Sequence, residues 1–128
     1  MSFDKSQHWL EMAEYDIESA KVMQKGGRYL YVGFLCHLTA EKSLKAIIAS
    51  GGVTPLKIHT LARLAELAGL INILSADQKA LLDELHPLNI EARYSAYKEK
   101  IAEILNDKYC KNLIEKTENF LSWIKAQL

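Results

Sequence analysis

Apolar residues recur at steps of three and four through most of this chain, which is the pattern of amphipathic helices. The first such stretch runs from Ser6 to about Gln24 and stops before paired glycines at 26 and 27, which favour a tight turn. The second stretch runs from about Tyr29 to Ser50 and is apolar over most of its circumference. We therefore expect this second stretch to be the central helix of the fold.

Three further helical stretches follow in the remaining pattern. Thr60 can cap a short helix, and Ser75 with Gln78 forms a capping-box pattern at the start of the next one. Pro87 should kink that fourth helix, because proline lacks a backbone donor and clashes with the preceding turn. The last helix spans about 107–126, and nothing in the chain has the alternation of a strand. The pattern predicts an all-α fold, an antiparallel up-and-down bundle of about five helices.

Composition adds limits to this picture. With 49% hydrophobic and 25% charged residues among 128, the chain suits one globular core, so we predict a single domain over residues 1–128. Since 16 basic residues balance 16 acidic ones, a nucleic-acid site must be a local patch. No stretch approaches the ~20 apolar residues that cross a bilayer, which predicts a cytoplasmic protein that does not bind a membrane. Cys36 and Cys110 lie among apolar neighbours, and we interpret both as reduced core thiols.

Two sets of polar residues interrupt the apolar faces. Asp16 falls inside the stripe of the first helix, where it is either paired structurally with a nearby Arg, Lys, Tyr or His or faces a ligand. His37, Glu41 and Lys45 are spaced i, i+4, i+8 along the central helix, and a glutamate beside a histidine favours the imidazolium. This polar strip could line a pocket, be solvated or face a dimer mate. Because the face that carries the strip is neither fully polar nor fully apolar, we expect a homodimer.

Two other segments suit a phosphate-bearing ligand. Lys57 and His59 lie just before the predicted third helix, whose unpaired amides and positive dipole end attract anions. Arg93, Tyr94 and Tyr97 combine a guanidinium that can fork onto phosphate with rings that can stack on bases. Both segments should lie at the same end of an antiparallel bundle, so we predict that they form one cleft.

Each of these groups also has a purely structural interpretation. A lysine on a surface loop is commonplace, and His59 could simply pack at its turn. Arg93 could pair with Asp16 or Glu91 while the two tyrosines pack the end of the bundle. The nearest match to a metal-binding pattern is a single Asp83-x-x-His86 beside a proline, and we predict neither a metal ion nor another cofactor.

Four segments together resemble one known family, the HEPN domains, small helical domains named for nucleotide binding in higher eukaryotes and prokaryotes. They are the first helix with Trp9, Ala13, Asp16 and Ala20; the block from Tyr31 to Ala46 with its Ala40-Glu41-Lys42-x-Leu44-Lys45-Ala46 ending; the Lys57-Ile58-His59-Thr60-Leu61 turn; and Ile90-Glu91-Ala92-Arg93-Tyr94. The middle block is the most specific, and the resemblance covers nearly the whole chain.

The resemblance implies a helical bundle that is usually dimeric, is often encoded beside a minimal nucleotidyltransferase and often belongs to a toxin–antitoxin pair. Many members are metal-independent RNases in which an Arg is followed, after four to six residues, by a His. Here Arg93 is followed at those positions by Lys98, Glu99 and Lys100, and no other arginine has a His at that spacing. The sequence therefore leaves open whether this chain is an enzyme.

Three functional hypotheses follow. The first is a non-enzymatic, dimeric domain that binds a nucleotide or RNA phosphate near Arg93 and Lys57 and works with a separately encoded nucleotidyltransferase. The second is a metal-independent RNase toxin in which His59 or Lys98 replaces the missing histidine beside Arg93. The third is a dimeric scaffold without a ligand.

Overall fold

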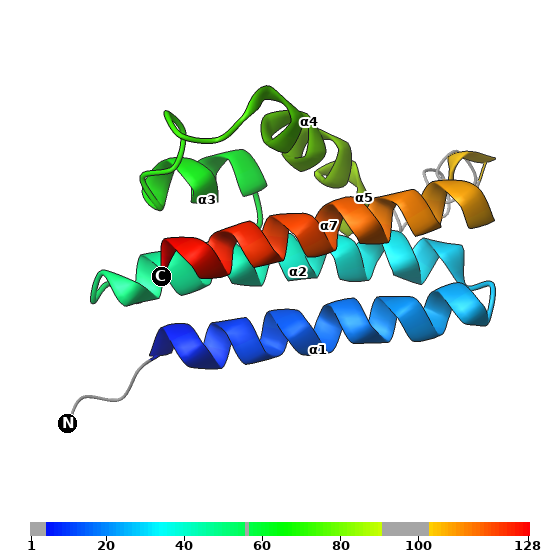
Figure 1. Ribbon diagram of the computed structural model, residues 1–128, viewed down its shortest axis with the longest axis horizontal. Helices are drawn as coiled ribbons and strands as arrows, with labels where there is room; N and C mark the ends of the chain where they lie inside the picture. The colour runs from blue at the N-terminus through cyan, green and yellow to red at the C-terminus, as the bar shows by residue number, and fades with distance from the viewer. Residues whose placement is uncertain (1–4, 56, 91–102) are drawn as a thin grey trace.

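The computed structural model describes residues 5–55, 57–90 and 103–128, and within these ranges it contains helices and no strand. The long helices α1 (Lys5–Lys25), α2 (Tyr29–Ser50) and α7 (Asp107–Gln127) lie side by side (Figure 1). The shorter helices α3 (Leu61–Leu67), α4 (Ala76–Leu85) and α5 (Pro87–Ile90) all pack against α2. The predicted all-α bundle is confirmed.

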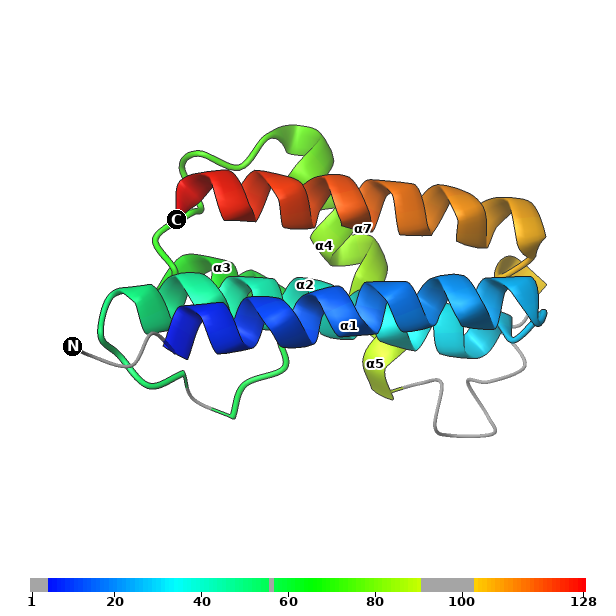
Figure 2. The same ribbon diagram turned by 60° about the horizontal axis from the view of Figure 1, so that its bottom comes forward.

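The order of the long helices follows from the turns between them. α1 and α2 form an antiparallel hairpin whose turn contains Gly27 at φ 72°, a conformation that favours glycine. α7 runs opposite to α1 and in the same direction as α2, because the intervening elements return the chain (Figures 1 and 2). Ion pairs join Glu14 to Lys125 and Lys21 to Glu118, so residues later in α1 lie beside residues earlier in α7, as in an antiparallel pair.

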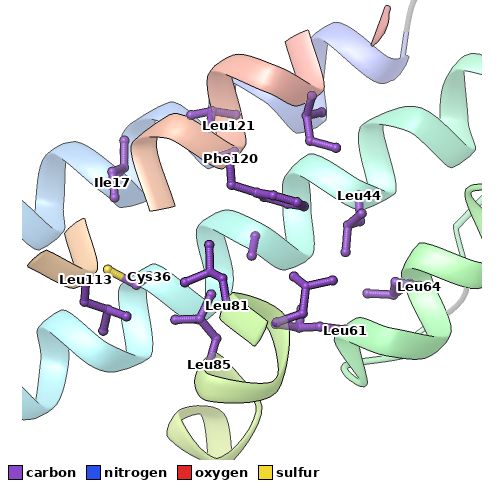
Figure 3. Packing of buried hydrophobic residues seen from close by; sticks show 14 of the residues in the cluster. Ile17, Cys36, Leu44, Leu61, Leu64, Leu81, Leu85, Leu113, Phe120 and Leu121 are labelled. Carbon is purple, nitrogen blue, oxygen red and sulfur yellow. The ribbon is translucent and has the colours of Figure 1, made fainter. Parts of the chain in front are cut away.

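The core is continuous from α1 to α4, and α2 lies at its centre. Figure 3 shows side chains from α1, α2, α3, α4 and α7 converging on this interior; among those labelled are Ile17, Leu44, Leu61, Leu81 and Phe120. Cys36 and Cys110 are buried and free, as predicted, and burial raises the pKa of the Cys36 thiol to about 12. Among the described residues, no helix is both long enough and apolar enough to cross a bilayer.

Local signals set most helix ends. The Gln78 amide donates to Ser75 Oγ at 3.0 Å and the Ser75 amide donates to Gln78 Oε1 at 2.9 Å, which confirms the capping box. The helical path breaks at His86, directly before Pro87, as proline requires. The prediction that Thr60 caps α3 is wrong, since the Thr60 side chain makes no capping hydrogen bond. The sequence pattern did not predict the cap of α7, which is Asn106; its Oδ1 accepts from the Tyr109 amide at 2.8 Å.

Candidate functional site

The polar strip of α2 is buried inside one chain. His37 is 0%, Glu41 4% and Lys45 5% exposed, with α1 on one side of α2 and α3, α4 and α5 on another. The solvated interpretation of this strip is therefore wrong. We also expected a dimer mate to cover this face, but the chain's own helices already cover it.

Glu41 is the centre of the strip. Lys45 Nζ donates to Glu41 Oε2 at 3.0 Å, and His59 Nδ1 lies 3.1 Å from Glu41 Oε1. The Glu41 side chain is 5% exposed, whereas that of His59 is 60% exposed. A buried carboxylate on the middle of α2 thus anchors an exposed imidazole that comes from the loop before α3.

His37 occupies the same interior without a matching partner. Its Nδ1 lies 3.8 Å from Glu41 Oε1, and neither ring nitrogen has a hydrogen-bond partner among the residues that the structure describes. Burial lowers the pKa of His37 to about 4; Glu41 and the backbone of His59 offset part of this effect, and the charges of His86 and His59 add to it. Glu41 does favour the imidazolium of His37, as expected, but desolvation outweighs this attraction and the pKa is lowered on balance.

Trp9 completes the strip from the side of α1. Lys45 Nζ lies 5.4 Å from the centroid of the Trp9 ring, within reach of a cation–π contact. The Lys45 ammonium is thereby held between a carboxylate and an aromatic face. The sequence did not predict this contact, since nothing near Trp9 in the chain indicates a partner on another helix.

Lys57 lies two residues before His59 on the same exposed loop and has no ion-pair partner among the described residues. Arg63, farther along, pairs with Glu66 of its own helix. α3 has only seven residues, so its dipole is a weaker attraction for an anion than that of a long helix. Within the described ranges, the basic groups on this loop that remain available are therefore Lys57 and His59.

Asp16 belongs to a separate pair. Lys42 Nζ donates to Asp16 Oδ2 at 2.6 Å, and the two side chains are 21% and 10% exposed. The contact joins α1 to α2 and corresponds to the structural interpretation of Asp16. Arg93, the other partner considered for Asp16, lies with Tyr94 and Tyr97 outside the described residues.

The chemistry available at this site centres on the His59 ring. Because a carboxylate accepts from Nδ1, the proton of a neutral imidazole belongs on Nδ1, and Nε2 on the other side of the ring becomes the acceptor. Protonation converts Nε2 into a donor for an anion. In the described part of the chain, no cluster of three His, Cys, Asp or Glu side chains could hold a metal ion.

Comparison with known proteins agrees with the helical architecture. The model of the HEPN domain family matches residues 6–127. The crystal structure of TT1696 from Thermus thermophilus is similar with a TM-score of 0.82 and 19% identity, over 98% of this chain and 100% of that one. ST0689, an archaeal HEPN homologue, is similar with a TM-score of 0.72 and 22% identity, over 95% and 96% of the two chains. No curated protein matches significantly in sequence.

Proposed function

This chain belongs to the HEPN domain family, and from that premise we propose that it binds the phosphate of a nucleotide or of RNA through His59 and Lys57. The observation that carries the proposal is the contact between His59 Nδ1 and the buried Glu41 carboxylate at 3.1 Å. An exposed histidine on a loop normally samples several rotamers, whereas this one has a fixed anchor. The remaining nitrogen, Nε2, is then preorganised for a ligand.

Charge supports a phosphate as that ligand. Lys57 has no described carboxylate partner, and the carboxylate nearest His59 is already shared with Lys45. A phosphate near Lys57 and His59 would accept from the ammonium and from protonated Nε2. We propose that Arg93 adds a guanidinium to the same ligand and that Tyr94 and Tyr97 stack on its base.

Binding of a fluorescent single-stranded RNA and of ATP, measured by anisotropy and by calorimetry, tests this proposal. We expect Lys57→Ala, His59→Asn and Arg93→Ala each to weaken binding, and the affinity to fall as salt rises. Lys79→Ala is the matched control, because Lys79 is an exposed lysine on α4. Equal binding by the parent and a Lys57→Ala, Arg93→Ala double variant would refute the site and favour the scaffold hypothesis.

A second candidate, RNA cleavage, draws on the same anchored histidine. Neutral His59 Nε2 could take the proton of a ribose 2′-hydroxyl as its oxygen bonds to the adjacent phosphorus, while the 5′-oxygen leaves and takes a proton from water. Glu41 would act as the positioning residue, like the carboxylate of a catalytic triad. Cleavage in the presence of EDTA that is lost in both His59→Asn and Glu41→Gln would favour this candidate over simple binding.

We further propose that the domain forms a homodimer and works beside a nucleotidyltransferase in a toxin–antitoxin pair, as the family resemblance implies. Exposed apolar side chains support an interface on the outer face of α1, where Tyr15 is 75% and Val22 66% exposed, seven residues apart. Light scattering should give a dimer mass, and Tyr15→Lys should reduce it to the monomer. A monomer mass for the parent at micromolar concentration would contradict the dimer.

A further inference from the structure

The outer face of α1 carries one stripe of exposed side chains. The stripe consists of Glu11, Tyr15, Glu18, Val22 and Lys25, which follow one another at alternating steps of four and three residues. Residues at these steps lie above one another on the same side of a helix. The opposite side of α1 packs against α2 and α7, and α1 lies at the edge of the bundle (Figure 1). We call these five residues the α1 stripe, which no described helix covers.

The α1 stripe is apolar near its middle and charged at its ends. Tyr15 is 75% and Val22 66% exposed, and these are the two largest exposed fractions among the large apolar side chains of the described residues. Glu11 at one end and Lys25 at the other have no ion-pair partner in the described ranges. An apolar centre with a charged rim is the arrangement of protein–protein interfaces.

The two unpaired charges of the α1 stripe have opposite signs, and the helix by itself explains only one of them. Lys25 lies in the last turn of α1, where the helix dipole favours a cation. Glu11 lies beyond the first turn, where the effect of the dipole has faded. Glu18, midway between them, is already paired with Lys21 at 3.1 Å. The stripe therefore has an acidic end and a basic end, about 20 Å apart along the helix axis.

A surface with two such ends is complementary to itself when two copies run antiparallel. If the two helices cross at Glu18, then Glu11 and the partner's Lys25 both lie seven residues from the crossing point and face each other. Tyr15 and the partner's Val22 meet between the crossing point and this charged pair. A parallel arrangement would instead place each charge beside its own copy, and like charges repel. Glu18 approaches the partner's Glu18 at the crossing point, but the ion pair within its own helix offsets this repulsion.

We propose that two copies of this chain meet through the α1 stripe as an antiparallel pair, with Tyr15 against the partner's Val22 and Glu11 opposite the partner's Lys25. The proposal rests on the homodimer proposed above and adds the orientation of the two chains and the charges that select it. The occupant of the stripe is a second copy rather than a different protein, because the same five residues supply both halves of every contact.

Sedimentation equilibrium of charge-reversed variants tests this pairing. Glu11→Lys and Lys25→Glu should each weaken dimerisation by about tenfold, because an exposed ion pair contributes little but each dimer contains it twice. An equimolar mixture of these two variants should restore dimerisation, since opposite charges face each other again in the mixed dimer. Glu115→Lys is the matched control, because Glu115 is an exposed glutamate on α7 outside the stripe, and it should leave dimerisation unchanged.

The outcomes separate this pairing from the dimer itself. A parent that sediments as a monomer would refute both. A dimeric parent whose affinity is unchanged by Glu11→Lys and Lys25→Glu, or weakened variants that do not recover on mixing, would overturn the antiparallel pairing and leave the homodimer in place. Circular dichroism should show that each variant is folded like the parent, because both side chains are exposed.

Discussion

Lowering the pH should destabilise this protein specifically through His37. The side chain is 0% exposed and its pKa in the folded chain is about 4, against an ordinary value of 6.5. Between these two values the unfolded chain takes up a proton at His37 and the folded chain does not. Unfolding therefore binds a proton in this window, and the free energy of unfolding falls as the pH falls from about 6.5 to about 4.

The magnitude follows from the difference between the two pKa values. One unit corresponds to about 1.4 kcal/mol, so a lowering from 6.5 to about 4 corresponds to about 3 kcal/mol of stability that is present at neutral pH and lost on acidification. Small domains are stable by only about 5–15 kcal/mol, so this loss is a large fraction of the total. Glu41, His59 and His86 all act on the same ring, so only a comparison with a variant isolates the contribution of His37.

Urea unfolding of the parent and of His37→Gln, at several values from about pH 7.5 to about pH 4.5, measures this effect. Glutamine retains a polar side chain but does not titrate, so the parent should lose about 2–3 kcal/mol more than the variant over this window. His59→Gln is the matched control, because His59 is an exposed histidine beside the same carboxylate. Parallel pH dependences of the parent and His37→Gln would refute the argument that desolvation dominates at His37.

Two further predictions concern the packing of α2. Asp16→Ala should cost about 2 kcal/mol of stability because it leaves Lys42 without its carboxylate, whereas Asp16→Leu combined with Lys42→Leu should recover most of that loss. Urea unfolding of the parent, both single variants and the double variant measures this coupling. An unchanged stability for Asp16→Ala would contradict it. Gly33→Val should lower the thermal midpoint by the equivalent of about 1–3 kcal/mol, since even a Cβ at this position would lie 3.2 Å from Leu88 and 3.3 Å from Leu105. Calorimetry measures the midpoint. An unchanged or raised midpoint would show that the two leucines can move aside.

The helices could be predicted from the sequence because their signals are local. The bounds expected for the central helix, Tyr29 to Ser50, are those of α2, and the capping box at Ser75 and the break at Pro87 follow from neighbouring residues alone. Thr60 shows the limit of this reasoning. A suitable residue type at a helix start does not ensure the cap, since the surrounding backbone must also place the hydroxyl near the free amides.

The candidate site was predictable only in part, because its contacts join distant segments. Spacing along α2 placed His37, Glu41 and Lys45 on one face, and that alignment is a local property. The contact of Glu41 with His59 depends on how the loop after α2 returns to the middle of that helix, which no pattern along the chain encodes. The lowered pKa of His37 depends on burial by other helices, so the i, i+4 spacing gave the effect of Glu41 but not the larger effect of desolvation.

The energetics of the polar strip of α2 argue that it serves more than stability. Burying Glu41 and Lys45 requires both charges to leave water, and apolar side chains of similar volume are often as stable or more stable at such positions. His37 adds a second cost, since its ring nitrogens are buried without hydrogen bonds to the described residues. What these costs provide is a fixed carboxylate beneath an exposed imidazole. We therefore interpret the buried residues as the support for His59, which makes the loop histidine, rather than the strip itself, the group to expect in contact with a ligand.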